Sequence, residues 1–223
     1  MSNLYIVATP IGNLKDITLR ALDILKQADI ILCEDTRTTK KLLSAHEIST
    51  RCMAFHKFST EKEIEHILNL FDEHEHIALV SDAGTPAISD PGSLLVKLVQ
   101  EQKPEVIIAA IPGASALTAA LSISGLPLSQ FTFVGFLPHK KGRQKKLDEA
   151  LANSYAVVLY ESTHRILKLL EEINSRQPER KIIICKELTK IHERVLKGTA
   201  SELLNEFDQN PSLQKGEFVV ICE

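Results

Sequence analysis

Several features that mark specialised protein classes are scarce in this sequence. Its 223 residues contain no tryptophan, eight phenylalanines and three tyrosines, so a broad aromatic platform for single-stranded RNA is not visible. No apolar run approaches the roughly 20 residues that cross a bilayer, and we therefore expect no membrane partner. Neither charge sign dominates, because 26 basic and 29 acidic residues give a net charge of −3. That balance excludes nucleic-acid binding by bulk charge and leaves room for a local basic patch.

Cysteine is also sparse and scattered. The four cysteines form no C-x-x-C pair, which argues against a metal cluster and against a disulfide framework in a chain of this size. Three of them follow apolar runs and are interpreted as buried side chains. The opening MSNLYIVATPIGN has no basic leader before its apolar stretch and does not resemble a secretory signal. We therefore expect a cytoplasmic protein, with no bound metal.

The residues that are present indicate an α/β protein. The chain is 44% hydrophobic and 25% charged, which is ordinary for a globular domain. Short apolar runs, typical of strands covered on both faces, alternate with amphipathic segments, and this order predicts largely parallel sheets. The predicted strands are 4–8, 29–34, 77–81, 105–111, 131–136, 155–160, 181–187 and 217–223, and the clearest predicted helices are 18–28, 60–73 and 163–175.

The alternation is interrupted once, by GLPLSQFTFVGFLP at residues 125–138. The charge changes there as well. Residues 1–111 carry 11 basic and 16 acidic side chains, net −5, whereas residues 112–223 carry 15 basic and 13 acidic side chains, net +2. We therefore predict two α/β lobes, comprising residues 1–112 and 113–223.

Glycine and proline gather in three loops that directly follow predicted strands. They are residues 10–12, 84–92 and 112–113. In open α/β sheets the ligand lies outside the carboxyl ends of the strands, so three such loops outline a binding cleft. The alternative interpretation is that they are only tight turns.

The segment VSDAGTPAISDPG, residues 80–92, is the densest of these signals. Asp82 stands at a strand end, where its carboxylate could accept from a sugar hydroxyl or an amine, and Gly84 permits close approach of a ligand. Asp90 is interpreted as a cap, because Pro91 suits a first helical position. In IPGAS, Ser115 is not a nucleophile elbow, since Leu117 stands where that motif needs glycine. The small residues here suit either an adenine or plain helix packing.

Basic residues supply the remaining candidates. Arg37 in CEDTRTTKK could hold phosphate, or could belong to a helix capped by Asp35. His56 could be a general base or an ordinary surface residue. The run HKKGRQKK, residues 139–146, lies in a stretch without any carboxylate from Val106 to Leu147. It is a candidate contact for an RNA backbone, with a solvated face as the alternative.

Taken together, these blocks resemble a known family. VATPIGNLKDIT, EDTRTTKKLL, ALVSDAGTPAISDPG, IPGASALTAALSISGLP, FVGFLPHKKGRQKK, YESTHRI, CKELTKIHERVLKGT and KGEFVVI resemble, in order, the tetrapyrrole methylase superfamily (class III methyltransferases), and within it the branch that methylates small-subunit ribosomal RNA. The resemblance covers essentially the whole chain. It implies two α/β lobes with a cofactor cleft between them, and a homodimer.

The resemblance also implies an activity. This is S-adenosylmethionine-dependent 2′-O-methylation of a cytidine ribose in the decoding region of 16S ribosomal RNA, free or within the 30S subunit. The residues implied to bind the cofactor are Pro10, Gly12, Ser81, Asp82, Gly84, Ile88, Ser115, Ala116 and Glu161. Arg37 and His56 are the candidate catalytic residues, because a ribose hydroxyl needs a base or a cation that favours its alkoxide. The candidate RNA contacts are Lys140, Lys141, Arg143 and Arg165.

Two alternatives stay open at this point. An enzyme of the same fold could act on a porphyrinoid (precorrin-like) substrate, whose carboxylates are also anionic. A non-catalytic module could bind the cofactor or the ribosome without turnover. One departure from the family is visible: its members commonly continue past KGEFVVI, whereas this chain ends at Glu223. We therefore expect any RNA affinity from such an extension to be missing.

Overall fold

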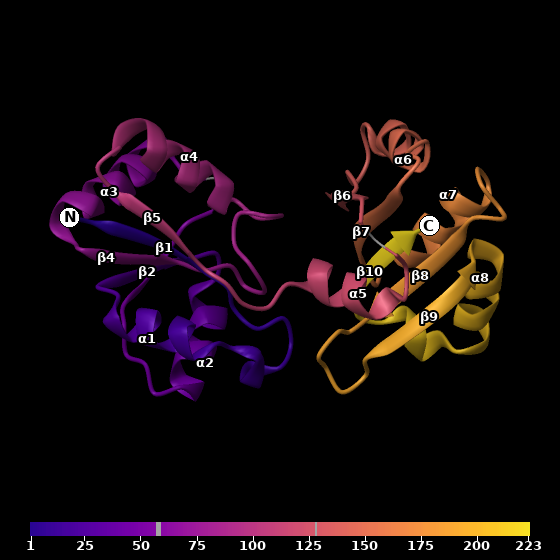
Figure 1. The fold of residues 1–223 in the computed structure, drawn as a ribbon, viewed down its shortest axis with the longest axis horizontal. Helices are drawn as coiled ribbons and strands as arrows, with labels where there is room; N and C mark the ends of the chain where they lie inside the picture. Colours follow the sequence, from indigo (N-terminus) through magenta and orange to yellow (C-terminus); the bar gives the residue numbers. More distant parts are fainter. Residues whose placement is uncertain (57–58, 128) are drawn as a thin grey trace. The chain divides into compact units, whose positions relative to one another are not determined.

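The computed structural model describes residues 1–56, 59–127 and 129–223. The described chain divides into two compact units, Met1–Ser115 and Ala116–Glu223, each built on one five-stranded sheet (Figure 1). The sequence placed this division at residues 112/113, slightly before the point at which the structure has it.

The sheet of the first unit is entirely parallel, in the order β3-β2-β4-β1-β5. Its helices cover both faces. One apolar cluster joins the sheet to α3 and α4, and a second joins it to α1 and α2. The elements are β1 (Asn3–Val7), η1 (Leu14–Asp16), α1 (Leu19–Gln27), β2 (Ile30–Cys33), α2 (Thr36–Ala45), β3 (Cys52–Ala54), α3 (Glu61–Glu73), β4 (His76–Leu79), α4 (Gly92–Gln102) and β5 (Ile107–Ile111).

Three helices of this unit start where the sequence carries a capping side chain. Thr18 accepts a hydrogen bond from the third residue after it, and Asp35 accepts from Arg37. Thr60 and Glu63 form a reciprocal capping box at α3. These side chains satisfy backbone N–H groups that have no partner inside the helix. The predicted helices 18–28 and 60–73 are thus present, each beginning at its cap.

The second unit has the strand order β6-β7-β10-β8-β9. Helices α6, α7 and α8 cover one face with the main apolar cluster, while α5 lies on the other face, where the Cys185 thiol contacts the carbonyl of Ala120. The elements are α5 (Ala116–Ser124), β6 (Phe131–Phe136), α6 (Arg143–Leu151), β7 (Ala156–Ser162), α7 (Ile166–Asn174), β8 (Lys181–Lys186), β9 (Arg194–Thr199), α8 (Ala200–Gln209), η2 (Pro211–Gln214) and β10 (Glu217–Cys222).

The prediction of parallel sheets is right for the first unit and wrong for the second. Only β6 and β7 pair in parallel there, and the other three pairs are antiparallel. An apolar run shows that both faces of a strand are covered, but it does not encode the direction of the neighbouring strand. The sequence also missed two strands: β3, which has only three residues, and β9, whose Arg194 and Lys197 are exposed on an edge strand.

Two expectations from composition can be compared directly with the described residues. Among them, no helix combines the length and the apolar character that crossing a bilayer requires. All four cysteines are free thiols, and Cys33, Cys185 and Cys222 are buried, as their positions after apolar runs predicted.

Candidate active site

Three loops at the carboxyl edge of the first sheet are joined by hydrogen bonds. They are residues 8–12 after β1, 80–91 after β4 and 112–115 after β5, called the first, second and third loops below. The backbones of Thr9 and Gly84 exchange two hydrogen bonds, at 2.9 and 3.0 Å. The hydroxyl of Thr9 donates to the carbonyl of Ser81 at 3.1 Å, and that of Thr85 donates to Ala114 at 3.2 Å. The loops therefore form one connected surface.

Two glycines allow this close approach. Gly84 has a φ of +84°, and a Cβ there would lie 3.3 Å from Cγ2 of Ile11. A Cβ at Gly113 would lie 2.9 Å from the Cβ of Ala8, a separation that carbon atoms do not tolerate without a shift. The sequence singled out both positions as turn residues. The structure adds that their missing side chains let the loops contact one another.

Asp82 ties the second loop to the turn that follows β2. Its Oδ1 accepts the backbone N–H of Asp35 at 3.1 Å, and its own backbone is hydrogen-bonded to the carboxylate of Glu34. Burial raises the pKa of Glu34, and the nearby charges of Asp90 and Asp82 raise it further. A half-buried carboxyl group with a raised pKa thus lies at the edge that carries the three loops.

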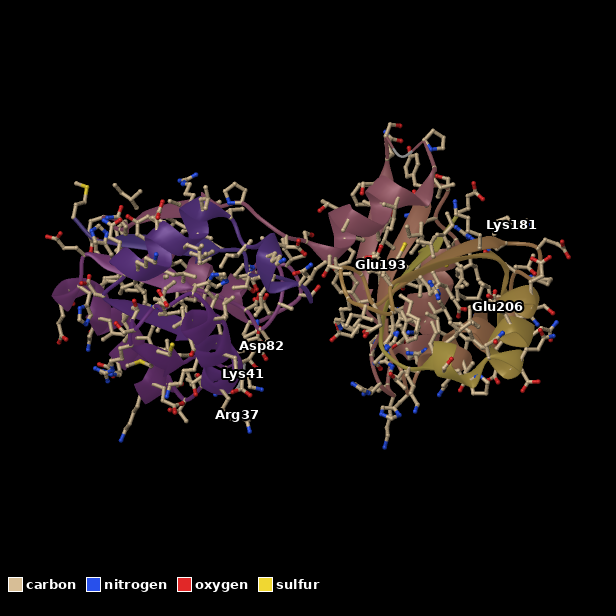
Figure 2. All side chains as sticks on the ribbon, turned by 90° about the horizontal axis from the view of Figure 1, so that it is seen from below. Arg37, Lys41, Asp82, Lys181, Glu193 and Glu206 are labelled. Atoms are coloured by element: carbon tan, nitrogen blue, oxygen red, sulfur yellow. The ribbon has the colours of Figure 1, made fainter. Side chains whose placement is uncertain are left out.

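Both candidate catalytic residues lie at this edge. Arg37, 87% exposed, donates from Nε and Nη2 to the carboxylate of Asp35, and these hydrogen bonds lower the pKa of Asp35 to about 2. The hydrogen bonds to Asp35 in turn raise the pKa of Arg37, and the charge of Asp82 adds to this rise (Figure 2). His56 is exposed, and its charge acts to lower the pKa of Glu34. Its backbone N–H donates to the Ser59 hydroxyl.

The other predicted cofactor residues of this unit belong to the same three loops. Asp90 closes the second loop by accepting the N–H groups of Ala87 and Gly92 at 2.8 and 2.9 Å. It caps this turn, but Pro91 is the N-cap of α4 and not its first helical residue as the sequence predicted. Ile88 projects into solvent between these groups. The remaining residues are distributed as follows: Pro10 and Ser81 are buried, Gly12 and Asp82 are exposed, and Ser115 is half-buried at the end of the unit.

A buried group of four charged side chains lies in the second unit. Glu161, at the end of β7, is surrounded by the protein, with 0% of its side chain exposed. Its Oε1 lies 3.1 Å from Nε of Arg165, and its Oε2 lies 3.5 Å from Nη1 of Arg143. Nε of Arg143 also donates to Oε2 of Glu172 at 2.9 Å. Two carboxylates and two guanidinium groups thus compensate one another inside the unit.

This group holds both ends of the segment 138–142, which carries the first basic residues of the predicted run 139–146. Nη2 of Arg165 donates to the carbonyl of Leu137 at 2.7 Å, just before the segment. Arg143 is the first residue of α6, just after it. Between them the side chains of His139, Lys140 and Lys141 are exposed. Residues 138–142 are called the basic loop below. The residues at its two ends, Leu137 and Arg143, are therefore both held by the group around the carboxylate of Glu161.

Comparison with known proteins identifies this architecture. The profile of the Tetrapyrrole (Corrin/Porphyrin) Methylases matches residues 3–204. The chain belongs to this family. It is 42% identical to "Ribosomal RNA small subunit methyltransferase I" of Thermotoga maritima, over 99% of this chain and 98% of that protein. The protein of the same name from Escherichia coli O157:H7 is 44% identical, over 99% of this chain and 77% of its own length.

Solved structures place the methylase in the same fold. Diphthine synthase superposes with a TM-score of 0.76 at 15% identity, over 99% of this chain and 89% of that one. Uroporphyrin-III C-methyl transferase from Thermus thermophilus, complexed with S-adenyl homocysteine, gives a TM-score of 0.68 at 19% identity, over 100% and 98% of the two chains. The predicted fold class and family are confirmed, and the chain is a methyltransferase of this family.

Three residue assignments made from the sequence need correction in the methylase. Arg143 was expected to contact RNA, but its side chain is 3% exposed and paired with two carboxylates. Arg165 was expected to contact RNA as well, yet it is 14% exposed and binds Glu161 and Leu137. Glu161 was assigned to the cofactor, whereas both of its oxygens bind these arginines. Ion pairs remove all three from the surface: Arg165 and Glu161 are four residues apart, whereas Arg143 and Glu172 are 29 apart.

The structure adds three candidate functional residues that the sequence did not assign to the site. Thr9 joins two loops through its backbone and hydroxyl, Glu34 carries the raised pKa, and Phe136 is an exposed ring beside the basic loop. For Phe136 a signal was present in FVGFLPHKK, because an aromatic residue next to lysines is typical of nucleic-acid surfaces. For Thr9 and Glu34, only tertiary contacts reveal the environment.

Proposed function

We propose that this chain is an S-adenosylmethionine-dependent methyltransferase that modifies small-subunit ribosomal RNA, at the 2′-hydroxyl of a cytidine in the decoding region. The observation that carries the proposal is similarity over nearly the full length to proteins named "Ribosomal RNA small subunit methyltransferase I" from several bacteria, at 42–44% identity for the first three. The basic loop adds a surface of suitable charge for an RNA backbone.

The three loops of the first unit have the chemistry to hold the cofactor. Gly84 and Gly113 let the three loops pack closely against one another, and Asp82 offers a carboxylate to a ribose diol or an amino group. Pro10, Gly12, Ser81, Ile88 and Ser115 line the same edge, with Ala116 next in the chain as the first residue of α5. A solved structure of the same fold is complexed with S-adenyl homocysteine, which supports the assignment. When bound, S-adenosylmethionine supplies an electrophilic methyl group on a sulfonium.

The substrate hydroxyl needs help to become a nucleophile. Arg37 presents an exposed guanidinium that can orient a phosphate or stabilise developing alkoxide charge. His56 and Glu34 can accept the hydroxyl proton, and the raised pKa of Glu34 brings it nearer to the pH at which a general base is effective. The transfer itself is a displacement between two positioned partners, so most of the catalytic effect comes from orientation.

The finer assignments belong to the same proposal. Lys140 and Lys141 contact the RNA backbone, as free RNA or within the assembled 30S subunit. The protein acts as a homodimer in the cytoplasm, where free thiols such as its four cysteines persist.

A methyl-transfer assay tests the proposal. The protein is incubated with labelled S-adenosylmethionine and small subunits from cells that lack this modification, and the product is mapped by mass spectrometry. We expect label on a single ribose 2′-oxygen. Label in a precorrin but not in RNA would establish the porphyrinoid alternative. Cofactor binding by calorimetry without transfer to either would establish a non-catalytic module.

A further inference from the structure

An aromatic cluster lies on the face of the second sheet opposite the buried ion pairs. The ring of Tyr160 contacts two phenylalanine rings edge-on, with centroid distances of 5.0 Å to Phe133 and 5.5 Å to Phe136. Tyr160 is further fixed by a hydrogen bond to the backbone of Leu117 in α5. The cluster is therefore rigid on its inner side.

Phe136 is the member of this cluster that faces solvent. Its side chain is 51% exposed, and it is the last residue of β6, an edge strand that pairs only with β7 among the described strands. A ring that is already held in a fixed orientation loses little side-chain freedom when it contacts a partner. Aromatic faces of this kind accept nucleobases, because every base has a π-face that stacks on them.

The surroundings of Phe136 determine which partner suits it. The basic loop begins two residues later, and Lys141 lies at most about 18 Å away along fully extended chain. There is no carboxylate in the sequence from Val106 to Leu147. Both ends of the loop are held by Arg143 and Arg165 on Glu161, so its exposed lysines are presented next to the end of β6. An apolar ring next to a loop of exposed cations complements a base with its phosphates.

From this juxtaposition we propose that Phe136 is a stacking site for an unpaired nucleobase of the RNA, with Lys140 and Lys141 binding the phosphates of the same strand. The inference rests on the proposed function, and it adds the form of RNA that is recognised. A fully paired helix keeps its bases stacked inside and cannot use this ring. The substrate segment must therefore present a splayed base when it binds.

Binding measurements with three probes test the site. They are a 12-nucleotide single-stranded RNA, the same sequence as a duplex, and heparin, a polyanion without bases. Phe136→Leu should weaken single-strand binding roughly ten- to a hundredfold and leave heparin binding unchanged. Phe136→Trp should restore it. Replacing Lys140 and Lys141 with Gln should weaken binding of both the single strand and heparin.

The chain offers a matched control on the same strand. Phe131 is 40% exposed at the opposite end of β6, and Phe131→Leu should change none of the three affinities. Equal losses for single strand and heparin in Phe136→Leu, or no loss, would overturn the stacking site. So would conversion of a dimer to monomers by Phe136→Leu in sedimentation equilibrium, since the ring would then belong to an interface with a second copy.

The outcome for the site is separate from the outcome for the function. Wild-type protein that methylates small subunits, together with unaltered single-strand affinity in Phe136→Leu, rejects the stacking site alone. Wild-type protein that binds none of the RNA probes and transfers no methyl group to small subunits rejects both.

Discussion

Arg143 and Glu172 form a buried ion pair in which Nε of the arginine donates to Oε2 of the glutamate at 2.9 Å. The arginine follows the exposed His139, Lys140 and Lys141 in a run of basic residues, and the glutamate comes from α7. Glu161 completes the pairing from the end of β7. Arg143 is therefore a structural cation, whereas Lys140 and Lys141 are exposed to solvent.

Replacing Arg143 with Gln should strongly destabilise the protein. The change leaves the buried carboxylates of Glu161 and Glu172 without their shared cation, and breaking a buried pair of this kind costs about 3–5 kcal/mol. Urea unfolding measures the loss. The control is Lys145→Gln, since Lys145 lies two residues away in an exposed pair with Glu149 and should change stability little. Similar stabilities for the two variants would contradict the structural role.

Stability should fall at acidic pH partly because of Glu172. Burial raises its pKa, but hydrogen bonds from Arg143 and Gln144 outweigh this, and its net pKa is lowered. A carboxyl group with a lowered folded-state pKa stabilises the fold above its unfolded value of about 4.3 and loses that contribution as pH falls through the folded value. Melting temperatures of wild type and Glu172→Gln should therefore converge as the pH is lowered through the acidic range below the unfolded pKa. A constant difference across this range would exclude the linkage.

Gly84→Ala should impair cofactor binding beyond its effect on the backbone. The alanine must adopt a φ of +84°, which costs about 1 kcal/mol, and its Cβ crowds Ile11 between two of the loops. Gly142→Ala is a closely matched control, with a φ of +83° and nothing within 4 Å of its Cβ. Calorimetry with S-adenosylmethionine should show weaker binding only for Gly84→Ala. Equal affinities would remove the second loop from the site.

Asp82→Ala should weaken S-adenosylmethionine binding by roughly tenfold or more, because it removes a charged hydrogen-bond acceptor worth about 1.5–3 kcal/mol. It also frees the backbone N–H of Asp35. Asp72→Ala is the control, since Asp72 pairs with Lys103 away from the loops. The measurement is calorimetry, and unchanged affinity in Asp82→Ala would mean that this carboxylate serves only the turn after β2.

Neutralising the exposed lysines should flatten the salt dependence of RNA binding. Each phosphate contact that is lost reduces the slope of log affinity against log salt by about 0.7 for a single strand. We expect this for Lys140→Gln and Lys141→Gln, measured by fluorescence anisotropy over a salt series. Lys97→Gln, an exposed lysine of α4, should keep the wild-type slope. An unaltered slope in the loop variants would leave those lysines as a solvated face.

Much of the fold follows from local patterns in the sequence. The eight predicted strands are all present, and Phe131–Phe136 has the predicted bounds. Helices begin where Thr18 and Thr60 can cap them, because capping depends on neighbours a few residues away. Direction of pairing in the second sheet was not predictable in this way. Strand β9 was missed because an exposed edge strand carries charges that weaken its apolar pattern.

The candidate site, too, was predictable from the sequence only where it depends on local features. Glycine and proline after strands β1, β4 and β5 mark the three loops in the sequence itself, because backbone conformation at those positions is a local property. The sequence likewise determined the family, through motifs spread over the whole chain. By contrast, Arg143, Lys140 and Lys141 are alike in the sequence, and only the fold separates them.

What the sequence by itself determined is the family, the α/β elements and the loops that point to a methyltransferase. What the tertiary structure alone decided is the environment of each charge and ring. It buried Arg143 against Glu172 and Glu161, left Lys140 and Lys141 in solvent, and set Phe136 beside them on Tyr160. The physical reason is that burial, pairing and pKa depend on groups that meet only after folding, from segments that lie far apart in the chain.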